Sequence, residues 1–131
     1  MDDLYREHVL DHYQNPRNYG EIENPDISHE AYNPLCGDRL ILELKLHDDH
    51  ISEVAFHGEG CAISQASASM LTEHIDGKSV DELKALTKDD ILDMLGIPIG
   101  PVRLKCALLS LKAVKAGIYG VNDWDFEEGT D

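Results

Sequence analysis

The chain has 131 residues and a formal net charge of −15 at pH 7, with 42% hydrophobic and 28% charged residues. This length predicts a single domain over residues 1–131, with enough core to fold without disulfides or a structural metal. So acidic a surface repels phosphate backbones and anionic lipid headgroups, which argues against nucleic acid and membranes as partners.

The first ten residues, MDDLYREHVL, lack the basic and apolar regions of a secretory signal. No apolar run approaches the roughly 20 residues that cross a bilayer. We therefore expect a cytoplasmic protein, and in that compartment its three cysteines do not predict a disulfide framework. Buried thiols, reactive thiols and metal ligands remain as interpretations.

The N-terminal part predicts one short helix and one weak strand. Apolar side chains over residues 3–14 have near-helical spacing. Pro16 and Gly20 then stop the helix, because both residues break helical structure. Residues 27–32 form a weak strand candidate.

A β-hairpin follows. Leucines at every second position predict a strand over residues 39–47 with one apolar face. Asp48 and Asp49 favour a tight turn, and residues 51–57 read as the return strand.

Helices dominate the second half. The stretch 61–75 is rich in small residues, which predicts a closely packed helix. Ser79 and Thr87 each open a further short helix, with Glu82 and Asp90 at the matching capping-box positions.

The last predicted helix starts near Pro101 and runs through Gly117, and either Gly117 or Gly120 can end it. Lys112 and Lys115 suit the negative end of its dipole. Residues 121–131 are predicted to be an acidic, mobile tail. An N-terminal helix, a small three-stranded antiparallel sheet and packed C-terminal helices define the α+β class.

The cysteines stand in separate contexts. Cys36 lies in a turn before the strongest strand, Cys61 opens a helix, and Cys106 lies in the second turn of the last helix. We expect the helix positions of Cys61 and Cys106 to stabilise thiolates. Asp38 lies two residues after Cys36, and Gly37 permits a local bend that would bring these two side chains together. The three cysteines and Asp38 would then provide four ligands for zinc or for iron in a cluster. Spacing alone is a weak signal, because no CxxC pair occurs.

Four motifs strengthen this hypothesis. They are DHYQNPRN at 11–18, NPLCGD at 33–38, GEGCAISQASAS at 58–69 and PVRLKCA at 101–107. In this order they resemble the U-type iron–sulfur cluster assembly family, which includes IscU, the NifU N-terminal domain and SufU. The resemblance covers almost the whole chain. It implies the IscU/SufU-like fold and the ligand set Cys36, Asp38, Cys61 and Cys106.

The resemblance implies an iron–sulfur assembly scaffold. Such a protein accepts sulfur from a cysteine desulfurase, binds iron and assembles a transient [2Fe–2S] cluster for apo-proteins or a downstream scaffold. The alternative is a SufU-like, zinc-dependent sulfurtransferase that relays persulfide sulfur, so whether the chain is an enzyme stays open. Cys106 is the candidate acceptor in a scaffold, and Cys36 in the SufU-like branch. The oligomeric state, monomer or cluster-bridged oligomer, also stays open.

Two departures place the sequence between the branches. Lys105 replaces the histidine that scaffolds usually carry before the last cysteine, and Ile99–Arg103 replaces their Leu-Pro-Pro-Val-Lys motif. Arg103 and Lys105, which we take as supporting residues, look more like SufU. Yet only 45 positions separate Cys61 from Cys106, so the extra segment of SufU is missing. A structural zinc-binding interaction domain is the third interpretation.

Overall fold

The computed structural model describes residues 2–34 and 37–119, so Cys36 and the predicted tail lie outside the described residues. The elements in chain order are α1 (Asp2–Gln14), β1 (Ile27–Asn33), β2 (Asp38–His47), β3 (His50–Glu59), α2 (Ala62–Ile75), α3 (Val80–Lys84), α4 (Lys88–Leu95), α5 (Pro101–Ala107) and α6 (Leu109–Tyr119). The predicted α+β class is confirmed. No described helix has the length and apolar character that a membrane span requires.

The sheet is an antiparallel meander in the order β1-β2-β3. Leu40, Leu42 and Leu44 on β2 are no more than 1% exposed, so the alternating pattern buries one face as predicted. Asp48 and Asp49 have φ angles of 53° and 64°. Two consecutive left-handed residues make the tight hairpin turn that suits the twist of the sheet.

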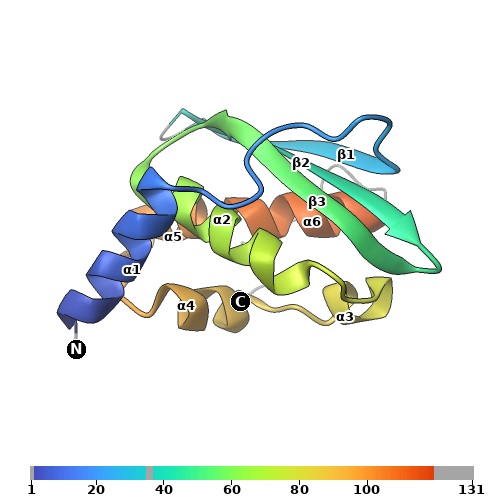
Figure 1. Ribbon diagram of the computed structural model, residues 1–131. Coiled ribbons are helices and arrows are strands. Elements are labelled where there is room, and N and C mark those ends of the chain that lie inside the picture. Colours follow the sequence, from blue (N-terminus) through green and yellow to red (C-terminus); the bar gives the residue numbers. More distant parts are fainter. Residues whose placement is uncertain (1, 35–36, 120–131) are drawn as a thin grey trace.

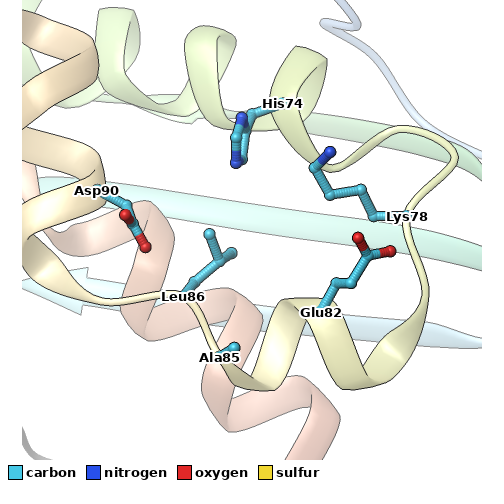
Figure 2. Close-up of a pocket in the computed structure, with 6 residues that line it drawn as sticks. All are labelled: His74, Lys78, Glu82, Ala85, Leu86 and Asp90. Carbon is cyan, nitrogen blue, oxygen red and sulfur yellow. The ribbon is translucent and has the colours of Figure 1, made fainter.

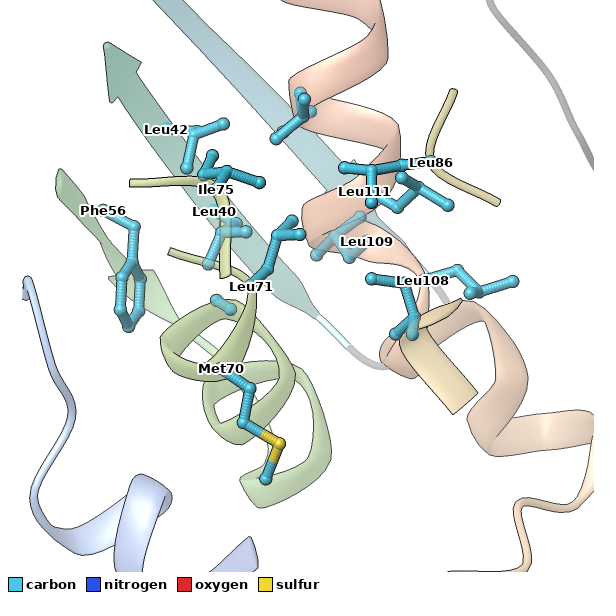
Figure 3. Close-up of a cluster of buried hydrophobic side chains, with 14 of the residues drawn as sticks. Leu40, Leu42, Phe56, Met70, Leu71, Ile75, Leu86, Leu108, Leu109 and Leu111 are labelled. Carbon is cyan, nitrogen blue, oxygen red and sulfur yellow. The ribbon is translucent and has the colours of Figure 1, made fainter. Parts of the chain in front are cut away.

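Two helices, α2 and α6, lie against the apolar face of the sheet (Figure 1). Figure 3 shows Leu71 of α2 and Leu111 of α6 converging with Leu40 and Leu42 of β2. Fully burying a side chain of this size contributes roughly 1.5–3 kcal/mol. This core therefore fixes α2 relative to the sheet, and with it the residues at the start of α2.

Helix α2 is the central element and contacts α1, α4, α5, α6 and β3. Ala66, Ser67 and Ala68 are each no more than 1% exposed. Small side chains at these positions let neighbouring backbones approach from several directions, which confirms the close packing predicted for residues 61–75.

Both predicted capping boxes are present. The Ser79 hydroxyl accepts from the Glu82 backbone nitrogen, and the Glu82 carboxylate accepts from the Ser79 nitrogen. Thr87 and Asp90 make the same reciprocal pair at α4. These hydrogen bonds to Ser79 lower the pKa of Glu82.

The single long C-terminal helix was a wrong prediction. Helix α5 ends at Ala107, and α6 begins at Leu109. Leu108 between them has φ −98° and ψ 3°. The sequence around Leu108 contains no glycine or proline that would break a helix. Both helices contact α2, but only α6 also packs on β1 and β2, so tertiary contacts set two helix directions.

Of the two glycines predicted to end this helix, Gly117 does not, because α6 continues to Tyr119, the residue before Gly120. A Cβ on Gly117 would lie 2.8 Å from Cγ2 of Ile27, so this glycine allows close packing against β1. Lys115 does not lie in the last turn of α6, so it does not balance the negative end of that helix dipole as predicted. Its ammonium donates to the carbonyl oxygen of Lys84 at the end of α3, and burial lowers its pKa.

We predict that Gly117→Val lowers the free energy of unfolding by about 1–3 kcal/mol, because the added methyl groups overlap Ile27. Urea unfolding measures this change. Combining Gly117→Val with Ile27→Ala should cost less than the sum of the two single variants. Additive costs would contradict the proposed overlap.

Candidate metal and sulfur site

Three of the four predicted ligands meet in the folded chain. Asp38, Cys61 and Cys106 each offer one ligand atom, and these atoms lie within 4.8 Å of one another. They come from the start of β2, the N-cap of α2 and the C-terminal end of α5. Cys36 lies outside the described residues. Two thiols and a carboxylate fit zinc or an iron–sulfur cluster by their chemistry.

The Asp38 carboxylate is 0% exposed and holds the start of α2. Its Oδ1 accepts from the Cys61 backbone nitrogen at 2.9 Å, and its Oδ2 lies 3.9 Å from the Cys61 Sγ. Cys61 makes no side-chain cap, and α2 has no acidic residue in its first turn. Asp38 therefore supplies the anion that the positive end of this helix favours.

A tight turn positions Asp38. Asn33 and Asp38 are paired residues of β1 and β2, and the Gly37 nitrogen donates to the Asn33 carbonyl at 2.9 Å. Gly37 has a φ of 73°, a left-handed conformation that glycine adopts without cost. Gly37 therefore makes a bend before Asp38, while the predicted approach of Cys36 to Asp38 lies outside the described residues.

Cys106 is fully buried, with 0% exposure, and its Sγ lies 3.7 Å from Nδ2 of Asn33. Asn33 was missed as a functional residue by sequence reasoning. Its signal was its place in the NPLCGD motif, since hairpin pairing puts it opposite Asp38. Asn33 is itself only 5% exposed, so its amide is a fixed donor beside the thiol.

The predicted position near a helix N-terminus is confirmed for Cys61 only. Cys61 is the N-cap of α2. Cys106 is the sixth residue of the seven-residue α5 and lies at its far end. The exposed Arg103 and Lys105 precede it on the same helix and are not part of the ligand group.

Gly60 leaves room for the carboxylate. A Cβ at this position would lie 2.7 Å from the Asp38 Oδ1 and 2.5 Å from the Ser64 Oγ. The backbone of the loop before α2 thus passes close to Asp38, and no larger residue fits without moving it.

A separate hollow lies between α2, α3 and α4 (Figure 2). His74 and Lys78 face Glu82 and Asp90 across it. The two carboxylates already accept from backbone nitrogens in the capping boxes. The two carboxylates of this hollow therefore act as helix-capping groups, and none of its residues belongs to the cysteine site.

A small α+β fold that gathers thiols and a carboxylate from three elements defines a class of protein that handles metal or sulfur at one shared centre. The chain belongs to the family of NifU-like N-terminal domains, whose family model matches residues 4–126.

Two curated relatives represent both branches. The zinc-dependent sulfurtransferase SufU of Bacillus subtilis is 41% identical, covering 90% of this chain and 91% of that protein. The iron–sulfur cluster assembly scaffold protein IscU of Escherichia coli is 42% identical, covering 87% of this chain and 91% of that protein.

Solved structures agree on the fold. An iron–sulfur cluster assembly scaffold protein for the SUF system from Fervidobacterium islandicum has a TM-score of 0.75 at 30% identity, covering 86% of this chain and 94% of its own. A NifU-like N-terminal domain from Brucella abortus has a TM-score of 0.75 at 27% identity, covering 92% and 95%.

We predict that Gly60→Ala weakens zinc binding at least about tenfold, because its methyl group displaces the Asp38 carboxylate. Competition with a zinc chelator measures the affinity. Gly100→Ala is the matched control, since a Cβ there meets nothing within 4 Å. Equal affinities for the two variants would contradict the steric argument.

We also predict that metal-free protein is alkylated at least about tenfold more slowly at Cys106 than at Cys61, because a fully buried thiol reacts only after local opening. Iodoacetamide labelling followed by peptide mass spectrometry measures both rates. In guanidinium the two rates should converge. Equal rates in the folded protein would show that α5 is open in solution.

Proposed function

We propose that this protein is an iron–sulfur cluster assembly scaffold, which takes sulfur from a cysteine desulfurase and builds a [2Fe–2S] cluster as its cargo. The observation that carries this proposal is the meeting of Asp38, Cys61 and Cys106 from three distant segments. Cys36 is the proposed fourth ligand. Recipient apo-proteins or a further scaffold would take the cluster.

Chain length favours the scaffold branch. The alignment with SufU runs over 135 positions, more than the 131 residues of this chain, although it covers only 90% of them. That relative therefore carries residues without a counterpart here. The alignment with IscU runs over 118 positions and covers 87% of this chain. The missing segment predicted from the spacing of Cys61 and Cys106 agrees with this difference.

A mixed ligand set suits a carrier. Oδ1 of Asp38 is engaged by the Cys61 nitrogen, which leaves Oδ2 on the side of the Cys61 Sγ. A carboxylate oxygen is a harder ligand than a thiolate and holds iron less tightly than a fourth cysteine would. The site can therefore bind a cluster and still release it.

Sulfur delivery would be a thiolate exchange. The acceptor thiolate attacks the terminal sulfur of the desulfurase persulfide, a new S–S bond forms, and the desulfurase cysteine leaves as its thiolate. Cys106 is our scaffold acceptor. Because it is fully buried, delivery to it requires α5 to move away from α2.

The second candidate is a zinc-dependent sulfurtransferase. The basic pair Arg103 and Lys105 on α5 and the 41% identity to SufU favour it. In that case Cys36 would be the acceptor and zinc the resident metal. Zinc would supply a Lewis acid that holds the thiolates until transfer.

The deciding experiment is anaerobic incubation with ferrous iron, cysteine and a cysteine desulfurase. A scaffold develops the visible absorbance of a cluster with acid-labile sulfide, and Cys61→Ser and Cys106→Ser lose most of both. His47→Ala, at the far end of the hairpin, should behave as wild type.

The alternatives give different results. A colourless product that retains zinc, with desulfurase turnover stimulated by the wild type and not by Cys36→Ala, would replace the scaffold with the sulfurtransferase. Loss of helical circular dichroism on zinc chelation, with neither cluster nor stimulation, would instead identify a structural zinc domain.

A further inference from the structure

A second group of metal-ligating side chains lies between α1 and α2. His8 and His12 are one turn apart on α1, and their ring centroids are 4.7 Å apart. Glu73 of α2 places Oε1 at 3.7 Å from Nε2 of His12. The three belong to one open groove of about 340 Å³, whose other lining residues are Met70, His74 and Met94.

His12 is oriented as a metal-binding histidine would be. The residue is 3% exposed, and its Nδ1 lies 2.7 Å from Oγ of Ser69. The same hydroxyl accepts from the Arg17 backbone nitrogen at 2.9 Å, so it is fixed in place. When Nδ1–H donates to Ser69, Nε2 presents its lone pair on the side of Glu73.

The protonation state also suits a ligand. Burial lowers the pKa of His12, and the charges of Arg17 and His8 lower it further, while Glu73 and Asp11 act in the opposite sense. A lowered pKa keeps the imidazole neutral near pH 7, which is the form that binds metal.

We propose that His8, His12 and Glu73 form a second site, independent of the cysteines, for a borderline divalent transition-metal ion such as Zn²⁺. Two imidazoles and one carboxylate form a common zinc ligand set with an open position. Of the described residues, only the cysteine group holds its ligand atoms within 4.8 Å without side-chain motion. His8 is exposed, so its ring can turn toward Nε2 of His12 without disturbing the core.

Metal binding would work against the charge of Arg17 and against one ion pair that this residue makes. Nε of Arg17 lies 3.9 Å from Oε2 of Glu73, and metal binding would compete with this ion pair. Both side chains are more than a third exposed, at 35% and 52%, and ion pairs with this exposure contribute little to stability. The net charge of −15 also raises the local concentration of cations.

Distance keeps the two sites separate. Cys61 and Glu73 are at opposite ends of α2, twelve residues apart, which corresponds to roughly 18 Å along a helix. A metal at the groove therefore shares no ligand with the cysteine site, and the two can be distinguished by the chemistry of their ligands.

Cobalt titration of the full-length, reduced protein tests the proposal, with Co²⁺ as the probe. The first equivalent should show the intense thiolate-to-cobalt charge transfer of the cysteine site. A second equivalent should add only weak visible bands, as nitrogen and oxygen ligands give. His8→Ala and Glu73→Gln should each weaken the second binding at least about tenfold and leave the first unchanged.

His47→Ala is the matched control, since it removes an exposed histidine elsewhere and should leave both bindings unchanged. The two test variants change exposed side chains, and circular dichroism checks that both fold. Absence of a second equivalent, thiolate charge transfer in it, or unchanged affinity in both variants would each overturn the proposal.

Discussion

The hydrogen bond from the Cys61 backbone nitrogen to the buried Asp38 carboxylate, 2.9 Å long, joins the first residue of β2 to the start of α2. An uncompensated buried charge costs several kcal/mol. Here the positive end of α2 faces the carboxylate, and the N–H group satisfies one of its oxygens. Asp38 thus holds the N-cap residue of α2 and is also a candidate ligand. Packing of α2 on the sheet holds this hydrogen bond in place, and the hydrogen bond keeps the Cys61 thiol close to the Asp38 carboxylate.

Much of the fold could be predicted because its signals are local. The leucines of β2 alternate with a period of two, and Ser79 and Thr87 each stand three residues before an acid. In both cases the partner that completes the structure is a near neighbour in the chain. The ligand set was predicted differently, from four motifs and a family resemblance. Spacing alone could not assemble it, since Asp38 and Cys106 meet only after the whole chain has folded.

Features that escaped prediction depend on distant partners. Lys115 donates to Lys84, 31 residues away, and Asn33 contacts Cys106, 73 residues away. Glycine carries two opposite signals, an end to a helix or a close approach between elements. At Gly117 the glycine serves the close approach to the neighbouring strand, and no pattern within α6 reveals this. The interruption at Leu108 has the same origin, because α6 packs on β1 and β2 as well as on α2, whereas α5 packs mainly on α2.

Electrostatics connects the site to its proposed partner. The chain has 11 basic and 26 acidic residues, so a basic pair is conspicuous on its surface. Arg103 and Lys105 are exposed on α5, the helix that also carries the buried Cys106. If the protein accepts sulfur as proposed, a persulfide anion approaching this helix would meet these two positive charges, whereas the net charge of the chain would repel it. Movement of α5 would then bring its buried thiol and its basic side chains to the incoming sulfur together.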